Sequence, residues 1–115
     1  MTPPDPEVVS VGVFTALADP NRRAILASLA VHGPSSATDL ARRLSITRQG
    51  IANHLALLAD AGLVTSDAGG GRRVVFRHRV EPIRVAQSYL ATLAADWDGS
   101  LARLSAFLDD PPATR

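Results

Sequence analysis

The fold of this chain is decided by residues 34–64, which read PSSATDLARRLSITRQGIANHLALLADAGLV. Ser36 and Asp39 have the spacing of a capping box, in which two side chains bond the first backbone amides of a helix. Thr47 precedes a second apolar-periodic run and is a favoured N-cap residue. The stretch therefore predicts two capped amphipathic helices joined by a short turn, which is a helix-turn-helix.

The second of these helices, expected over 47–61, has two unlike faces. The buried stripe predicted by its i, i+4, i+7 spacing consists of Ile51, Leu55 and Leu58. Gln49 and Asn53 fall on the far side, and Arg48 precedes them. Arg suits guanine edges and Gln or Asn suits adenine edges, so this face is suited to reading bases in a DNA major groove.

The residues after this helix predict a β-hairpin. Residues 63–67 and 72–78 read as two strands, and the loop AGGG at 68–71 contains glycines that permit the positive φ angles of a hairpin. Arg72 and Arg73 follow the loop directly. A helix-turn-helix followed by a hairpin with a basic rim is a winged helix. We therefore predict a mainly α fold with a small β-hairpin.

The flanking segments complete a single domain over 7–110. Residues 7–18 have near-helical apolar spacing, and an Asp-Pro pair then starts a second helix that ends at the His-Gly-Pro sequence of 32–34. Residues 1–6 and 111–115 contain prolines and polar residues, and we expect both to be disordered.

Apolar positions step by three and four over 82–108, which predicts a long amphipathic helix. Its stripe spans some three heptads and includes Trp97. A small domain cannot cover such a stripe alone, so a second chain is the expected cover, and a helix folded back on its own domain is the alternative. Asp98, Gly99 and Ser100 predict a bend or interruption, since glycine costs about 1 kcal/mol within a helix.

Charge and composition narrow the possible functions. The chain has no cysteine, which excludes disulfides, thiolate metal sites and cysteine nucleophiles. Nine of its twelve arginines lie within residues 21–80, against three aspartates, and a local basic region of this kind suits a nucleic-acid partner. The N-terminal residues do not resemble a signal peptide, and no long apolar run occurs, so we expect a soluble cytoplasmic protein with no membrane partner.

With these elements in place, the sequence resembles the ArsR family of bacterial winged helix-turn-helix repressors over about residues 12–108. The resemblance rests on ALADPNRRAIL (16–26), on ATDLARRLSITRQGIANHLALLADAGLV (37–64) and on GGGRRVVFR (69–77). Trp97 in the last helix is similar to the branch of the family without metal sites. The resemblance implies a homodimer that places two recognition helices in successive major grooves of a palindromic operator.

The resemblance also assigns roles to individual residues. The expected DNA-binding residues are Ser36, Thr47, Arg48, Gln49, Asn53, Arg72 and Arg73. The family dimerises mainly through its first and last helices, here 7–18 and 82–108. The expected dimer-interface residues are Val13, Phe14, Leu90, Leu93, Trp97, Leu101 and Leu104. We expect His54 to pack the recognition helix rather than to contact DNA. Four further arginines are expected to be ordinary surface charges, with a position of Arg42 or Arg43 near the DNA backbone as the alternative: Arg22, Arg23, Arg42 and Arg43.

Metal sensing of the kind found in the family is not expected here. Ser36 and Thr38 match the positions of the thiolate ligands in arsenic and cadmium sensors, and neither can replace a soft ligand. The last helix contains Asp96 and Asp98 but no histidine. We therefore expect no metal and no cofactor, which leaves constitutive or autoregulatory repression, a small apolar ligand at the dimer interface, or control by protein partners.

Two other classes of function agree less well with the sequence than a dimeric repressor does. A winged-helix module could bind a protein through the Trp97 helix, but such modules usually carry acidic or apolar residues on the recognition face. An enzyme is not expected, because the chain has no nucleophile motif, paired acids or phosphate loop. The sequence thus predicts a sequence-specific DNA-binding transcriptional regulator, with helix 47–61 in the major groove and the wing, residues 67–73, on the backbone or in the minor groove.

Overall fold

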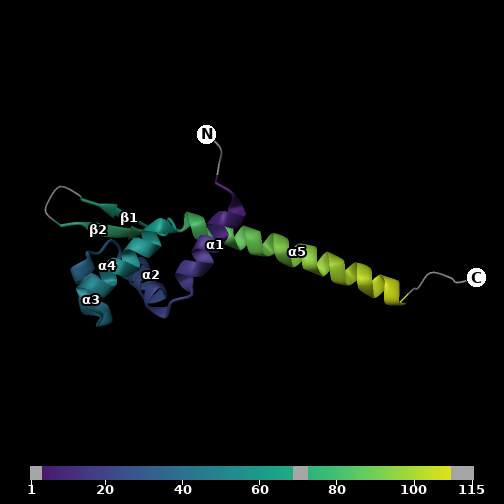
Figure 1. The fold of residues 1–115 in the computed structure, drawn as a ribbon, viewed down its shortest axis with the longest axis horizontal. Helices are drawn as coiled ribbons and strands as arrows, with labels where there is room; N and C mark the ends of the chain where they lie inside the picture. Colours follow the sequence, from purple (N-terminus) through teal and green to yellow (C-terminus); the bar gives the residue numbers. More distant parts are fainter. Residues whose placement is uncertain (1–3, 69–72, 110–115) are drawn as a thin grey trace, which may run out of the picture.

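Five helices and one two-stranded hairpin make up the part of the chain that the computed structural model describes, residues 4–68 and 73–109. In chain order they are α1 (Pro6–Leu17), α2 (Pro20–His32), α3 (Ala37–Leu44), α4 (Arg48–Asp60), β1 (Val64–Asp67), β2 (Val75–His78) and α5 (Glu81–Asp109) (Figure 1). This order confirms the predicted winged helix-turn-helix, mainly α with a small hairpin. The expected tail, residues 111–115, and residues 1–3 of the expected N-terminal lead lie outside the described residues, whereas Asp5 caps α1 and Pro6 begins it.

The first four helices begin where small polar side chains accept hydrogen bonds from their first-turn amides. The four N-cap residues are Asp5, Asp19, Ser36 and Thr47. Each cap satisfies an amide that has no partner within its helix, and this fixes the starting point of the helix. Local sequence thus determines where α1 to α4 start.

The C-terminal end of α1 is held by two arginines of α2. Arg22 donates from Nε to the Ala16 carbonyl oxygen over 2.7 Å, and Arg23 donates from Nη1 to the Leu17 carbonyl oxygen over 2.6 Å. These carbonyls have no amide partner within the helix, so cations at this position also complement the helix dipole. Both arginines therefore also have a structural role, which the sequence did not predict.

One apolar core joins the four short helices, the first strand and the start of α5. Its buried members are Val13, Ala16, Ile25, Leu26, Leu29, Leu40, Ile51, Leu55, Leu58, Leu63, Val64 and Ala86. The predicted stripe of the second helix of the motif lies wholly within this set. Burying that stripe turns the opposite face of α4 toward solvent.

The hairpin is attached to the helix-turn-helix as well as to itself. Its antiparallel strands pair Val64 with His78 and Asp67 with Val75. Phe76 also exchanges two backbone hydrogen bonds with Ser35, over 2.9 and 3.2 Å. The second strand is shorter than predicted and begins at Val75; residues 69–72 lie outside the described ranges.

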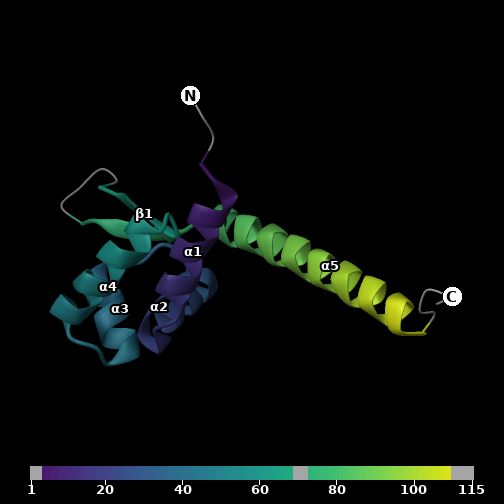
Figure 2. The same cartoon turned by 45° about the vertical axis from the view of Figure 1, so that its right-hand side comes forward.

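Helix α5 is a continuous rod of 29 residues that leaves the domain (Figures 1 and 2). Its first turns cross α1, where the rings of Phe14 and Tyr89 lie 6.5 Å apart. The predicted bend at 98–100 is wrong, because the helix runs through Gly99, beside which Arg103 donates to the Ser100 hydroxyl over 3.1 Å. The fold-back alternative is also wrong, since the far half of α5 points away from the domain.

Candidate nucleic-acid interface

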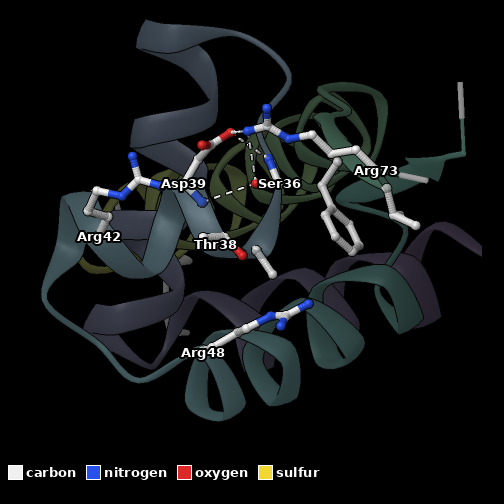
Figure 3. Close-up of a pocket in the computed structure, with 9 residues that line it drawn as sticks. Ser36, Thr38, Asp39, Arg42, Arg48 and Arg73 are labelled. Atoms are coloured by element: carbon white, nitrogen blue, oxygen red, sulfur yellow. Dashed lines mark hydrogen bonds and ion pairs between the residues drawn. The ribbon is translucent and has the colours of Figure 1, made fainter. Parts of the chain in front are cut away.

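A groove of about 730 Å³ opens between α3, the first turn of α4 and the hairpin (Figure 3). The residues lining it are Ser36, Ala37, Thr38, Asp39, Arg42, Arg48, Arg73, Val74 and Phe76. Arg42 comes from α3, Arg48 opens α4, and Arg73 precedes β2. Three guanidinium groups from separate parts of the chain concentrate positive charge in one concave surface, which suits a phosphate backbone.

The start of α3 forms one wall of this groove and is rigidly built. The Ser36 hydroxyl accepts from the Asp39 amide, and Asp39 Oδ2 accepts from the Ser36 amide, each over 3.1 Å. This is the predicted capping box, with Asp in the place of the usual Glu. The Ser36 amide, assisted by the Ser36 hydroxyl and Arg73, lowers the pKa of Asp39 despite some desolvation by burial. A fixed negative charge therefore lies in the basic groove.

Arg73 reaches from the hairpin to this capping box. Its Nη2 donates to Asp39 Oδ2 and, over 3.2 Å, to the Ser36 hydroxyl (Figure 3). The Asp39 side chain is 21% exposed and that of Arg73 is 63% exposed, so solvent screens the ion pair in part. The side chain of Arg73 and the backbone of Phe76 both connect the hairpin to the start of α3.

Helix α4 starts with a tight turn and presents a polar outer face. The Thr47 hydroxyl accepts from the Gly50 amide over 3.0 Å. A Cβ at Gly50 would lie 3.0 Å from Thr47 Oγ1 and 3.1 Å from a methyl group of Ile46, so the cap leaves little room for a larger residue. One turn along, Gln49 Nε2 donates to Asn53 Oδ1 over 3.1 Å, and both side chains are exposed.

Comparisons with known proteins agree on one family. A helix-turn-helix domain family matches residues 17–67. The uncharacterized HTH-type transcriptional regulator YuzN of Bacillus subtilis is 44% identical over 78 residues, which cover 63% of this chain and 84% of that protein. The HTH-type transcriptional regulator Rv2034 of Mycobacterium tuberculosis is 41% identical over 85 residues, covering 74% of this chain and 71% of that protein.

A solved structure extends this similarity to the fold. The ArsR-like transcriptional regulator from Rhodococcus sp. RHA1 matches with a TM-score of 0.80 and 35% identity, over 88% of this chain and 93% of that one. The chain belongs to the ArsR family. It is accordingly a DNA-binding transcriptional regulator of the winged helix-turn-helix type, and the interpretation as a protein-interaction module is not favoured.

In this ArsR-family chain, the predicted DNA-binding residues fall into four groups. Arg48 and Arg73 share the groove, while Thr47, Gln49 and Asn53 are exposed at the start and along the outer face of α4. Ser36 also lines the groove, but it is only 6% exposed, and its hydroxyl is engaged in the capping box and by Arg73. Arg72 lies outside the described residues.

Sequence reasoning did not assign Thr38 or Asp39 to this surface, and it placed Arg42 or Arg43 near the DNA backbone only as an alternative. Thr38 and Arg42 line the groove one helical turn apart, and Asp39 lies between them. Their i, i+4 spacing, on the side of α3 away from the buried Leu40, was the available signal. Arg43, expected to be a surface charge, instead donates to the Ser35 hydroxyl over 2.8 Å and thus helps to fix the segment before α3.

His54 lies at the edge of the core. It is half-buried, and its Nδ1 is enclosed without a hydrogen-bond partner among the described residues. Desolvation raises the pKa of Asp19, but the amides of Asn21 and Arg22, the Arg22 charge and His54 together lower it further than burial raises it. This half-buried position on α4 is compatible with the packing role predicted for His54.

A second surface of the ArsR-family fold is apolar and exposed. We call the following residues the apolar face of α5: Leu90, Leu93, Trp97, Leu101 and Leu104. Trp97 is 66% exposed, and Phe14 of α1 lies partly exposed near the start of this face. Val13 requires a correction as an interface residue, because it is 1% exposed and packs in the core of its own protomer.

Residues 4–68 and 73–109 contain neither a metal-binding cluster nor a membrane-spanning helix. Within these ranges, no three His, Cys, Asp or Glu side chains are grouped so that they could hold a metal ion. The helices described there include none that combines the length and apolar character needed to cross a membrane.

Replacing Thr47 tests whether its cap holds the recognition helix. Thr47→Ala removes the acceptor for the Gly50 amide and should lower the free energy of unfolding by about 1 kcal/mol. Thr47→Ser keeps a hydroxyl and should stay within a few tenths of wild type. Urea unfolding followed by circular dichroism, at one fixed protein concentration, measures both. Equal stability of all three proteins would show that the cap contributes nothing.

Proposed function

We propose that this ArsR-family protein is a dimeric repressor that binds a palindromic operator with α4 in the major groove and the hairpin on the backbone or in the minor groove. The observation that carries the proposal is the junction of the basic groove with the polar face of α4. Arg48 belongs to both, because it lines the groove and opens the helix that presents Gln49 and Asn53. Phosphate binding and base reading can therefore occur on one surface.

Base reading is assigned to the outer face of α4. Arg48 can donate two hydrogen bonds to guanine O6 and N7, while Gln49 and Asn53 can each bond the adenine N6 and N7 edge. The hydrogen bond between Gln49 and Asn53 restricts their rotamers before DNA arrives, which reduces the entropy lost on binding. Each good bidentate contact contributes about 1–3 kcal/mol of discrimination between bases.

Backbone binding is assigned to the arginines around the groove and to the helix starts. Arg42 and Arg73 lie on opposite sides of the groove, and Arg72 directly precedes Arg73 in the sequence. The exposed Thr47 stands at the N-terminus of α4, where backbone amides and the helix dipole favour a phosphate. These contacts position the protein along the duplex and carry no sequence information themselves.

Dimerisation is assigned to the apolar face of α5 together with α1. The exposed leucines and Trp97 occupy one side of a helix that the protomer leaves uncovered beyond its first turns. A second copy of the same face would remove this surface from water at about 25 cal/mol per Å² of apolar area. A two-fold axis at this contact would give two α4 helices about 34–36 Å apart, the spacing of successive major grooves.

Repression follows if the bound dimer covers promoter DNA. Such a regulator acts in the cytoplasm, where a bacterial chromosome lies, and its role is regulatory rather than catalytic. The absence of cysteine from the chain removes the thiolate switch of the arsenic sensors. Control would then come from a small apolar ligand at the dimer interface, from a protein effector, or from the protein's own concentration.

Arg48 gives the first test of this arrangement. Arg48→Ala should lower the discrimination between an operator duplex selected from genomic DNA and a scrambled duplex by about 1–3 kcal/mol. Arg103→Ala removes an equal charge from α5, far from the groove, and should leave this discrimination unchanged. Fluorescence anisotropy at one salt concentration measures both affinities. Equal weakening of the two duplexes by Arg48→Ala would make Arg48 a phosphate contact instead.

Trp97 gives the second test. Trp97→Asp places a charge in the centre of the apolar face of α5 and should convert the dimer to a monomer. Ala95→Asp adds the same charge about 160° away around the helix and should leave a dimer. Sedimentation velocity distinguishes the two states. A Trp97→Asp protein that sediments as the wild-type dimer would contradict the assignment of this face.

A further inference from the structure

Arg73 differs from the other two arginines of the groove. Its guanidinium is engaged by Asp39 and Ser36, whereas no described residue forms an ion pair or hydrogen bond with the side chain of Arg42 or Arg48. Asp39 is an acid on a surface that must approach a polyanion. Its carboxylate is held in place by the Ser36 amide, so it cannot simply swing away from the DNA.

Asp39 thus neutralises one of the cations that the groove offers to phosphate. An arginine that is paired with a carboxylate of its own chain does not neutralise a phosphate, so it releases no counterion from the DNA until the pair separates. Because both side chains remain partly exposed, the pair is weak and can exchange its carboxylate for a phosphate. The exchange needs a phosphate held close to Arg73. This requires that α4 and the hairpin both sit in their specific positions on the DNA duplex.

We propose that Asp39 is a specificity-determining residue. It keeps Arg73 paired, and therefore off the DNA backbone, in complexes with non-operator DNA, and it releases Arg73 to a phosphate in the operator complex. The inference rests on the proposed DNA-binding surface and adds that Asp39 controls whether Arg73 is available to DNA. On random DNA, Arg73 stays on Asp39 and contributes no phosphate contact. On the operator, contacts of α4 with the bases hold the duplex in place, and Arg73 exchanges Asp39 for a phosphate.

The salt dependence of binding measures this exchange directly. Each phosphate contact adds about 0.9 to the slope of log affinity against log salt concentration. On a random-sequence 30-base-pair duplex, Asp39→Asn should steepen the slope by about 0.9 and raise the affinity about fivefold to tenfold at 0.1 M salt. On the operator duplex the slope should not change. Asn keeps an amide oxygen that can accept from the Ser36 amide, so α3 stays capped.

Arg73 substitutions supply the controls. Arg73→Ala alone should reduce the slope by about 0.9 on the operator and leave it unchanged on random DNA. The double variant Asp39→Asn with Arg73→Ala should lose the gain of Asp39→Asn on random DNA. A gain that persists without Arg73 would overturn the inference, because Asp39 would then act only by repelling phosphate.

The single Arg73→Ala variant tests the inference even if Asp39→Asn fails to fold. If Arg73→Ala changes the salt-dependence slope on random DNA, the inference is overturned. Failure of the proposed DNA surface looks different. In that case the wild-type protein itself would show no salt-sensitive binding to either duplex. Wild-type binding with an unchanged Asp39→Asn slope on random DNA would overturn the role of Asp39 alone.

Discussion

The two backbone hydrogen bonds between Ser35 and Phe76 are the constraint on which the DNA-facing surface depends. They join the hairpin to the residue immediately before the α3 cap, so the wing and the helix-turn-helix cannot move independently there. The capping box then orients α3, and Arg73 adds a side-chain link across the same junction. As a result, Arg73 lines one groove with Arg42 and Arg48, although it lies 25 residues beyond Arg48 in the sequence.

The second feature of the protein is a contrast in apolar burial: the domain buries its apolar residues, whereas the last helix exposes most of its own. The core of the domain closes around the apolar sides of α1 to α4, and it covers α5 only near Ala86 and Tyr89. Beyond this crossing, leucines and Trp97 face solvent along a continuous helix. Reading DNA and associating with a second copy are therefore assigned to opposite ends of an elongated molecule.

Residues that act through short-range spacing were predictable from sequence, and residues that act through tertiary contacts were not. The caps at Asp19, Ser36 and Thr47 and the buried stripe of α4 were predicted because they depend on neighbours within about one or two helical turns. The burial of Val13 and the engagement of Arg73 by Asp39, 34 residues away, depend on how elements pack. The bend expected at Gly99 failed because a local cost of about 1 kcal/mol does not break a long helix.

Hydroxyl-radical footprinting of the wild-type protein on DNA selected from the genome tests the central claim, that two copies read one operator with paired α4 helices. The account predicts two protected segments on one face of the duplex, with centres about 10–10.5 base pairs apart, or a multiple of that spacing. A single protected segment, or two segments on opposite faces of the duplex, would contradict it.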